Sequence, residues 1–600
     1  MATAAAALCL PLALTTASTA QAATGPSARQ LSQLETVAPS PSLSALGARV
    51  VGRLPGSTQM TAELALRPRS QAAITSFIDE VATPGSPMFH HYLTPGDYGG
   101  RFGPTTAALK AVEAQLRSDG LSVLSVSANR LLVKFSGSAT RMEAAFHTGL
   151  DRVRLPGGEI GRATSSSVRL PESISRYTQA VIGLDNLVSL TNGLARDDRP
   201  AKAVSSATEA RIAKHTHGVT SAPTACSAAL QTQALYGAIT DQQLADAYGV
   251  NGLYSDGDYG AGQTVDIFEL EPFSISDVAT FDKCYFGQSH TSNIKVTAID
   301  GGPGSGLGSG EAALDVDDVS AIAPKAHIHV FEAPNIGPDT DDPYSSLDVY
   351  NAIAMADDAS AISTSWGLCE TELQQGQPGY QQAENNVFEQ TAAQGQSVFA
   401  AAGDDGSDDC AGHDNSPVAS DLSLDDPASQ PYVASVGGTT FLKATEPPVE
   451  SVWNNGTDGG AGGGGISETW AMPLWQAGFR TQPSSQQACS DDPKGTLDDL
   501  YHLPGVATTL PAGTLCRQTP DVSGLADPQS GITIVYDGQF FPIGGTSSST
   551  PLWAAMTADM SASRACAAND LGFVNPLLYQ VGKSSGYSTA FNDITAGNND

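Results

Sequence analysis

Apolar and polar positions between about Val50 and Leu190 switch repeatedly between a two-residue period and a helical period. A two-residue period predicts a strand, and apolar residues spaced i, i+3, i+4 predict a helix. The pattern predicts strands over 63–67, 121–126 and 130–135, and helices over 71–81, 105–117 and 139–146. Strands and helices in this order predict an α+β domain of roughly ferredoxin-like type.

Residues 191–235 lose this periodicity and are rich in Ala, Ser, Thr, Asp and Lys, as in the run 201–206. Such a composition is typical of a linker, and an exposed linker is a preferred place for proteolysis. We therefore interpret 191–235 as a linker and processing region.

From residue 236 onward, short apolar-rich segments alternate with segments of helical spacing. The apolar-rich segments predict buried strands over 264–268, 326–331, 361–365, 397–402 and 432–436, with helices over 351–356 and 382–393. Apolar strands that alternate with helices predict an α/β domain with a parallel sheet covered on both faces. In such a sheet the functional site is expected at the carboxyl ends of the strands.

Composition adds a charge asymmetry to this two-domain organisation. The 600 residues contain 63 Asp and Glu against 30 Lys and Arg, a formal net charge of -33. Residues 1–200 hold 18 Lys and Arg and 14 Asp and Glu, which leaves 12 and 49 in the remainder. Because phosphate binding needs clustered basic residues, this balance argues against a nucleic-acid partner. It predicts that the two parts attract each other at neutral pH and less so in acid.

The N-terminus predicts export. Residues 1–22 form an apolar stretch that ends in the small-residue pattern Ala20-Gln21-Ala22, as in a secretory signal peptide, although no Lys or Arg precedes Arg29. No later segment has about 18 consecutive apolar residues, so the sequence predicts no membrane-spanning helix. We therefore expect a secreted, extracellular protein with no membrane partner.

Cysteine usage agrees with an oxidising compartment. Of the eight cysteines, Cys9 lies in the predicted signal peptide, and no two cysteines form a CxxC pair. Zinc or thioredoxin-like chemistry is therefore unsupported, and disulfides are expected for an exported chain. Proximity in the sequence predicts the pairs Cys369–Cys410 and Cys489–Cys516, and the odd count leaves one thiol free.

The segment Gly544-Gly-Thr-Ser547 precedes an apolar run that predicts a helix. This arrangement presents a hydroxyl at a helix N-terminus, where the dipole and free N–H groups stabilise an oxyanion. A plain helix cap is the alternative interpretation. A nucleophilic serine needs a base. None of the ten histidines is followed by Gly-Thr, as in the subtilisin-type base, so a Ser-His-Asp triad is poorly supported.

Acidic side chains offer another base. Glu311 and Asp315 are spaced i, i+4, which places them on one face of a helix. Two neighbouring carboxyl groups hinder each other's ionisation, which raises the apparent pKa of the pair and lets them share a proton. A solvated acidic helix N-terminus is the alternative. Asp404 follows the apolar strand 397–402, where a turn aspartate in a Gly-rich loop is the alternative.

Together these segments resemble the sedolisins, the serine-carboxyl peptidases with a subtilisin-like fold and a pro-kumamolisin-type prodomain. The resemblance runs from about residue 48 to the end. It includes the motifs Pro87-Met-Phe-His-His-Tyr-Leu-Thr-Pro95, Arg101-Phe-Gly-Pro104, Ser363-Thr-Ser-Trp-Gly367 and Pro520-Asp-Val-Ser523. It implies a pro-kumamolisin-type activation prodomain over 48–190 and a subtilisin-like peptidase domain over 236–600.

The resemblance also implies site residues. It makes Ser547 the nucleophile, Glu311 its general base, Asp315 the residue that orients Glu311, and Asp404 the oxyanion-hole aspartate. Glu269 and Trp366 lie where the family's patterns continue, and we expect them to support the catalytic carboxyls. A Glu base is best matched to a pH near its pKa of about 4, where a protonated Asp can donate a hydrogen bond to an oxyanion. The implied chemistry is therefore acid chemistry.

Sedolisins also carry a calcium site near the C-terminus that begins with an Asp-Ile pair. Asp593 and Ile594 match that beginning, and the sequence stops at Asp600 before the rest of the pattern. A carboxylate and a backbone carbonyl are hard oxygen ligands suited to Ca²⁺. The resemblance therefore implies Ca²⁺ at a partial site.

We expect a secreted, acid-active serine-carboxyl endopeptidase made as a zymogen and acting as a monomer. Its expected partners are protein or peptide substrates and its own prodomain, which would inhibit it within the same chain. A tripeptidyl-type exopeptidase of the same family and an inactive secreted protein with this fold are the alternatives. A peptidase that uses the paired acids as in aspartic peptidases is a further one, but it leaves Ser547 without a role.

Overall fold

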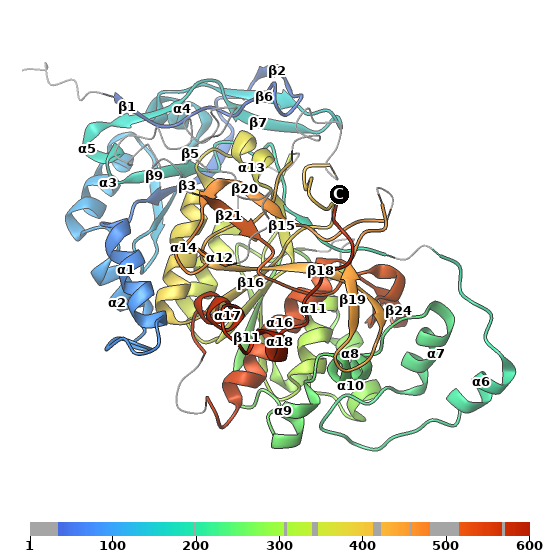
Figure 1. Ribbon diagram of the computed structural model, residues 1–600. Helices are drawn as coiled ribbons and strands as arrows, with labels where there is room; N and C mark the ends of the chain where they lie inside the picture. Colours follow the sequence, from blue (N-terminus) through green and yellow to red (C-terminus); the bar gives the residue numbers. More distant parts are fainter. Residues whose placement is uncertain are drawn as a thin grey trace, which may run out of the picture.

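A computed structural model describes residues 34–196, 199–304, 309–335, 337–338, 346–411, 422–456, 459–479, 515–566 and 571–600. The predicted signal peptide and Cys489 lie outside these residues. An N-terminal domain sits on one side of a larger C-terminal domain, as the blue-to-cyan and green-to-red ribbons of Figure 1 show. None of the helices described is long and apolar enough to cross a membrane.

The N-terminal domain is built on a four-stranded antiparallel sheet in the order β4-β5-β3-β9. Its chain order, strand, helices, two strands, helix and strand, is that of a ferredoxin-like unit. The elements are β3 (Gln59–Leu66), α1 (Gln71–Ala82), α2 (Pro95–Arg101), α3 (Thr106–Ser118), β4 (Ser122–Val126), β5 (Leu132–Ser138), α4 (Ala139–Phe146) and β9 (Thr178–Ile182). All six elements predicted over 63–146 are present.

Shorter strands complete this domain. They are β1 (Leu34–Ala38), which pairs with β8 (Val168–Pro171), and β2 (Arg49–Arg53), β6 (Leu150–Arg154) and β7 (Ile160–Thr164), which form a three-stranded sheet. The short helix α5 (Glu172–Ser175) connects β8 to β9. The predicted α+β class is confirmed.

The C-terminal domain contains an eight-stranded sheet that is parallel except for one antiparallel edge strand. Its strands are β12 (Ile294–Ala298), β13 (His327–Glu332), β11 (Thr264–Glu269), β14 (Ala361–Thr364), β16 (Ser397–Ala401), β18 (Val433–Lys443), β22 (Val522–Leu525) and the antiparallel β19 (Val449–Val452). All five strands predicted for this region are present. The fold is the expected subtilisin-like one.

Helices cover both faces of this sheet, as its apolar strands predict. Alternate residues of β11 point to opposite faces, so Val265 and Ile267 belong to one apolar core and Phe268 to another. The first core holds α10 (Ile275–Phe286), α11 (Ser309–Ile322) and α16 (Thr546–Ala562). The second holds α12 (Ser346–Ala356) and α14 (Tyr380–Gln394).

The N-terminal domain docks on α12 and α14, and its buried side chains continue the second core without a break. At this contact Lys134 of β5 forms ion pairs with Asp300 and Asp348, both with N–O distances of 2.7 Å. Asn129 donates a 2.7 Å hydrogen bond to Gln390 of α14. Figure 1 shows the blue helix α1 running beside the yellow helix α14.

The region 191–235 is more structured than its composition predicts. It begins with β10 (Thr191–Asn192) and contains α6 (Ser206–Ile212) and α7 (Ser227–Tyr236). A serine cap at Ser205 initiates α6, a signal that the loss of apolar periodicity conceals. A disulfide between Cys226 and Cys284 ties the start of α7 to α10. The domain boundaries themselves stay a prediction.

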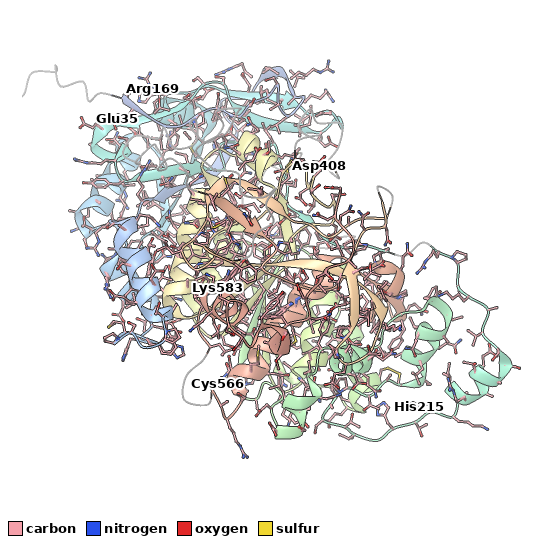
Figure 2. The ribbon with its side chains drawn as sticks, viewed as in Figure 1. Glu35, Arg169, His215, Asp408, Cys566 and Lys583 are labelled. Atoms are coloured by element: carbon pink, nitrogen blue, oxygen red, sulfur yellow. A yellow bond between two sulfur atoms is a disulfide. The ribbon has the colours of Figure 1, made fainter. Side chains whose placement is uncertain are left out.

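The predicted disulfide Cys369–Cys410 is present. Cys516 is also disulfide-bonded, but the predicted partner Cys489 lies outside the described residues. Among the cysteines described, Cys566 is the free one. It lies at an edge of the C-terminal domain in the view of Figure 2.

Candidate active site

Two packed helices bring the predicted nucleophile and base together. Helix α16 follows Gly545, whose φ of 107° is accessible to glycine, and carries Ser547 in its first turn. The next hydroxyls are all bonded: Ser548 donates to the Leu525 carbonyl, Ser549 to that of Gly437. The buried Ser547 Oγ has no hydrogen-bond partner within the described residues. Ser547 is therefore not a helix cap.

Glu311 lies in the first turn of α11, which packs against α16. Its side chain is buried, and neither carboxyl oxygen forms a hydrogen bond to the described part of the chain. Burial raises the pKa of Glu311 well above its usual value, the charge of Asp315 raises it further, and the Ser547 hydroxyl lowers it. A buried carboxyl group thus faces the free hydroxyl of Ser547, and such contacts commonly tighten only with a substrate in place.

Asp315 lies one helical turn after Glu311 and is held by a hydroxyl. Ser365 Oγ donates to both carboxyl oxygens of Asp315, at 2.9 and 3.1 Å. Burial raises the pKa of Asp315 to about 8, although the bonds from Ser365 and Glu269 lower it. Sequence reasoning missed Ser365, which lies in the Ser363–Gly367 motif but carries no signal of its own.

Glu269 and Trp366 extend this group of acids. Trp366 Nε1 donates a 3.0 Å hydrogen bond to Glu269 Oε2. Burial and then the charges of Asp315 and Glu311 raise the pKa of Glu269 well above its usual value. Three buried carboxyl groups at close range cannot all ionise, so they must share protons.

Asp404 lies just after β16 and faces the start of α16. Its Oδ1 accepts hydrogen bonds from the Thr546 backbone N–H at 2.7 Å and from the Thr546 hydroxyl at 2.8 Å. Its Oδ2 is buried and has no partner among the residues described. Burial raises the pKa of Asp404 to about 7, while the two bonds from Thr546 lower it. The free Oδ2 is thus available to donate when Asp404 is protonated.

A segment of the predicted linker crosses this site as an extended strand. β10 pairs antiparallel with β15 (Trp366–Cys369), and the Gly193 N–H donates to the Ser365 carbonyl at 3.2 Å. After the next residue, Ala195 exchanges two backbone hydrogen bonds with Gly544, at 3.0 and 2.9 Å. The chain is therefore fixed on both sides of the Gly193–Leu194 peptide bond.

This peptide bond lies beside the predicted catalytic groups. A Cβ added to Gly193 would lie 3.1 Å from Ser547 Oγ and 3.4 Å from Asp404 Oδ1. A Cβ added to Gly545 would overlap the Gly193 carbonyl oxygen and lie 2.7 Å from Asp404 Oδ2. The Gly193 carbonyl oxygen and the free Oδ2 of Asp404 therefore crowd the same point. Nothing in the sequence of the linker signals this placement.

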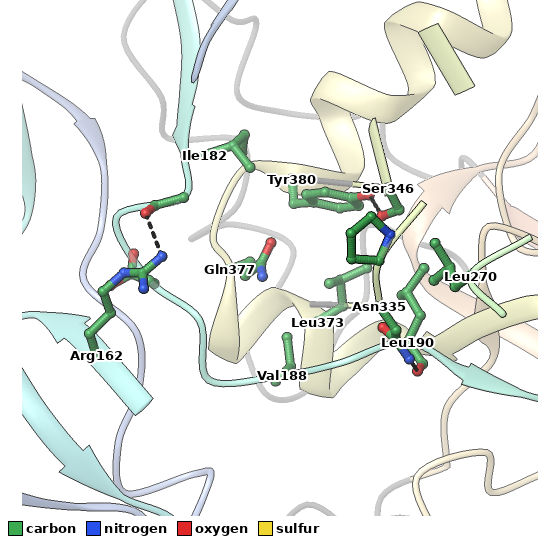
Figure 3. Close-up of a pocket in the computed structure, with 13 residues that line it drawn as sticks. Arg162, Ile182, Val188, Leu190, Leu270, Asn335, Ser346, Leu373, Gln377 and Tyr380 are labelled. Carbon is green, nitrogen blue, oxygen red and sulfur yellow. Dashed lines mark hydrogen bonds between the residues drawn. The ribbon is translucent and has the colours of Figure 1, made fainter. Parts of the chain in front are cut away.

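Upstream, the same segment runs along the joint between the two domains. Asn335 Nδ2 donates a 2.8 Å hydrogen bond to the Leu190 carbonyl. Figure 3 shows both residues at a small cavity of about 40 Å³, with Arg162 on the N-terminal domain and Tyr380 on the C-terminal one. The linker thus reaches the site along a surface to which both domains contribute.

The structure around Asp593 and Ile594 gives little support to the predicted calcium site. Asp593 is exposed and accepts a 2.9 Å hydrogen bond from the Tyr587 hydroxyl. Among the residues described, one group of three metal-ligating side chains occurs, formed by Asp266, His329 and Asp358. Its imidazole suits a metal such as zinc better than Ca²⁺, which takes six to eight oxygen ligands. Asp593 and Ile594 do not by themselves form a calcium site, and calcium there stays a prediction.

Comparisons with known proteins agree with this architecture. Residues 46–187 match the family described as Pro-kumamolisin, activation domain, and residues 300–567 match the Subtilase family. Kumamolisin of Bacillus sp. (strain MN-32) is 32% identical over 480 residues, covering 78% of this chain and 72% of that protein. Sedolisin of Pseudomonas sp. (strain 101) is 27% identical over 547 residues, covering 89% and 81%.

A further relative carries a different activity in its name. Tripeptidyl-peptidase 1 of Canis lupus familiaris is 25% identical over 554 residues, covering 88% of this chain and 84% of that protein. The extent of the kumamolisin match, together with the activation domain ahead of a subtilisin-like domain, decides the family. This chain belongs to the sedolisin family of serine-carboxyl peptidases and is a hydrolase with an N-terminal activation domain.

Proposed function

We propose that this protein is an exported, acid-active serine-carboxyl endopeptidase made as a zymogen. The single observation that carries the proposal is the buried, unbonded hydroxyl of Ser547 beside Glu311 and the Gly193–Leu194 peptide bond. A hydroxyl at a helix N-terminus next to a carboxyl base and a peptide carbonyl is an arrangement for acyl transfer.

In the proposed reaction, Glu311 takes the proton of Ser547 as the hydroxyl oxygen attacks the carbonyl carbon of the substrate. Asp315, held by Ser365, orients Glu311 and shares the proton that Glu311 has accepted. The oxyanion of the tetrahedral intermediate accepts a hydrogen bond from protonated Asp404. Glu311 then returns the proton to the leaving amine, and water hydrolyses the acyl-enzyme by the same steps.

The same groups give the reaction an acid optimum. Asp404 can donate to an oxyanion only when protonated, which holds below its pKa of about 7. Glu311 can accept a proton only when ionised, so activity must also fall at the lowest pH values. The two requirements limit activity from opposite sides. We infer a maximum in acid, where the coupled carboxyl groups of Glu269, Glu311 and Asp315 share protons and one of them stays ionised.

Zymogen character is supported by the path of the linker. The segment 191–195 occupies the site in an antiparallel, substrate-like pairing with β15. We infer that the prodomain inhibits by covering the cleft, and that Ser547 cuts the linker at Gly193–Leu194. Cleavage there would free the part of the cleft that residues 190–193 occupy, once the prodomain has dissociated.

An endopeptidase is favoured over the tripeptidyl-type alternative by the length of bound chain. An enzyme that releases tripeptides must close its cleft beyond the third residue before the scissile bond. Here Leu190 is the fourth residue before Gly193–Leu194, and it continues directly into the prodomain. A cleft that accepts chain on both sides supports internal cleavage.

Digestion of a long peptide blocked at both ends tests the proposal. The acid-treated wild-type protein should cut it internally, whereas the Ser547→Ala protein should cut nothing and remain full length. Cleavage only of peptides with a free N-terminus would favour the tripeptidyl type. Undiminished activity of the Ser547→Ala protein would contradict the proposed chemistry and favour an aspartic-type use of the paired acids.

A further inference from the structure

An acidic cavity opens beside Gly193. Its volume is about 360 Å³, and the linker residues 191–195 form one of its walls. The opposite walls are the ends of two strands, represented by Gly367 and Gly403. Because Gly193 has no side chain, the residue that precedes the scissile bond projects nothing into this space.

Carboxyl groups lie close to the backbone at both Gly367 and Gly403. A Cβ added to Gly367 would overlap the carboxylate of Asp425, and one added to Gly403 would overlap that of Asp409. Both aspartates line the cavity together with Asp405. The two glycines therefore leave the space that lets these carboxyl groups reach the wall beside the substrate.

The described lining of the cavity offers these carboxyl groups no cation. No Lys, Arg or His is among the described residues that line the cavity. Asp409 is buried, and its Oδ2 has no hydrogen-bond partner in the described part of the chain. Burial raises the pKa of Asp409 and of Asp425 well above the usual value. Buried acids without a cation are costly, and a ligand that brings one relieves that cost.

We propose that this cavity is the pocket for the substrate residue before the scissile bond and that Asp409 and Asp425 make it select Arg or Lys. This proposal rests on the proposed function, since it takes Ser547 as the nucleophile that fixes the scissile bond. An arginine offers five N–H donors to a pair of carboxyl groups, and a lysine offers a compact charge. Gly193 then occupies the position of the residue before the scissile bond but has no side chain to fill the pocket. We expect the linker to block the cleft while being cut slowly.

The preference should depend on pH with a definite sign. Among the described residues, the titratable groups that line the cavity are Asp404, Asp405, Asp409 and Asp425, and the charges of Asp408 and Asp426 act on them from beside it. As pH rises they lose protons, so the attraction for a cationic side chain grows. Selectivity for a cationic residue should therefore increase with pH across the active range.

The test compares blocked peptides that differ only in one residue before the scissile bond: arginine, lysine, citrulline, leucine or glutamate. Citrulline is a neutral analogue of arginine with nearly the same shape, so the arginine-to-citrulline ratio of kcat/KM isolates the charge. Activated wild-type enzyme should show a ratio of about ten or more, which is typical of a hydrogen-bonded charge pair. The ratio should increase from pH 3 to pH 6.

The variants D409N and D425N should each lower that ratio severalfold. Asp256→Asn, an exposed change at the end of α9 (Asn251–Asp256), is the matched control and should leave it unchanged. Equal rates for arginine and citrulline by an enzyme that cuts all the peptides would overturn the pocket proposal alone. A wild-type ratio that does not change with pH would also overturn it, even if the variants fail to fold. Absence of cleavage of every peptide would overturn the proposed function, and this proposal with it.

Discussion

Gly193 lies across the hydroxyl of Ser547, so that a Cβ on Gly193 would be 3.1 Å from Ser547 Oγ. The backbone of the linker is fixed on both sides of this point, by Ser365 before it and by Gly544 after it. The zymogen therefore holds a segment of its own chain in the register of a substrate.

The first autocatalytic cut is predicted at Gly193–Leu194. At early times after acidification, one fragment should end at Gly193 and the other begin at Leu194, as intact-mass measurement and N-terminal sequencing would show. The S547A protein should yield neither fragment. A first cut in the exposed region around α6 instead would contradict the register inferred from Gly193 and Ala195.

Gly545 is predicted to be irreplaceable for activity. A Cβ there would overlap the Gly193 carbonyl oxygen, and an alanine would also be strained at a φ of 107°. Gly545→Ala should lower kcat/KM by about a hundredfold or more, as expected when the carbonyl loses its position in the oxyanion hole.

A matched variant separates strain from crowding. Gly538 also has a positive φ, of 68°, but a Cβ there would meet nothing within 4 Å. Gly538→Ala should therefore cost stability of about 1 kcal/mol, seen in thermal unfolding, and leave kcat/KM close to that of the wild type. Similar loss of activity in both variants would show that backbone strain, not crowding at the carbonyl, is responsible.

Asp404 is predicted to set the neutral limit of activity. Its pKa of about 7 means that it loses its donor proton as pH rises through that value. Activity of the wild type should fall over the same range. Asp404→Asn should remove that fall, because an amide donates a hydrogen bond at every pH, with acid activity within about tenfold of the wild type.

Asp404→Ala serves as the comparison, since it offers no donor. It should lose about 10² to 10³ in kcat at all pH values. A pH–rate profile of Asp404→Asn that still falls near pH 7 would assign the neutral limb to another group.

Acidification is predicted to strengthen, not weaken, the contact between prodomain and peptidase domain. Burial raises the pKa of Asp300 to about 6 and of Glu389 to about 8, and burial and then the charge of Asp348 raise that of Glu63. Once separated and exposed, these groups would return towards a pKa of about 4. Association therefore takes up protons, and its free energy becomes more favourable as pH falls from about 8 to about 4.

This sign is opposite to that expected from net charge. We expect proton uptake by the carboxyl groups buried at the contact to outweigh the attraction between distant charges, which salt screens beyond about 10 Å. The Ser547→Ala chain, nicked in its exposed linker by an added protease, should stay associated at pH 5 at least as well as at pH 8 in size-exclusion chromatography. Dissociation on acidification would restore the charge-attraction account. Acid would then trigger activation by separating the domains, whereas we expect it to act by enabling cleavage.

The fold was largely predictable because its cores are regular. β11, β13, β14 and β16 are short apolar-rich segments that alternate with helices, and the burial of their apolar side chains follows from that pattern. The region 191–235 was not, because β10 is two residues long and is ordered by pairing with β15 rather than by its own side chains. Local propensity carries no information about such a contact.

The site was predictable only in part. The spacing of Glu311 and Asp315 places them on one face of a helix, and the glycines before Ser547 indicate a hydroxyl at a helix N-terminus. How closely these groups approach depends on how α11 packs against α16. Ser365, Thr546 and the cavity aspartates Asp409 and Asp425 act through contacts between segments far apart in the chain. No pattern within one segment could have identified them.

The central claim is that Ser547 acts with a carboxyl base, and a pH–rate profile between pH 3 and pH 8 tests it most directly. The activated wild-type protein should show a maximum in acid. Glu311→Gln, which keeps the shape of the side chain but cannot accept a proton, should lose about 10³ or more in kcat, as Ser547→Ala should. Glu311→Gln with activity near that of the wild type, or a wild-type maximum at alkaline pH, would contradict the account.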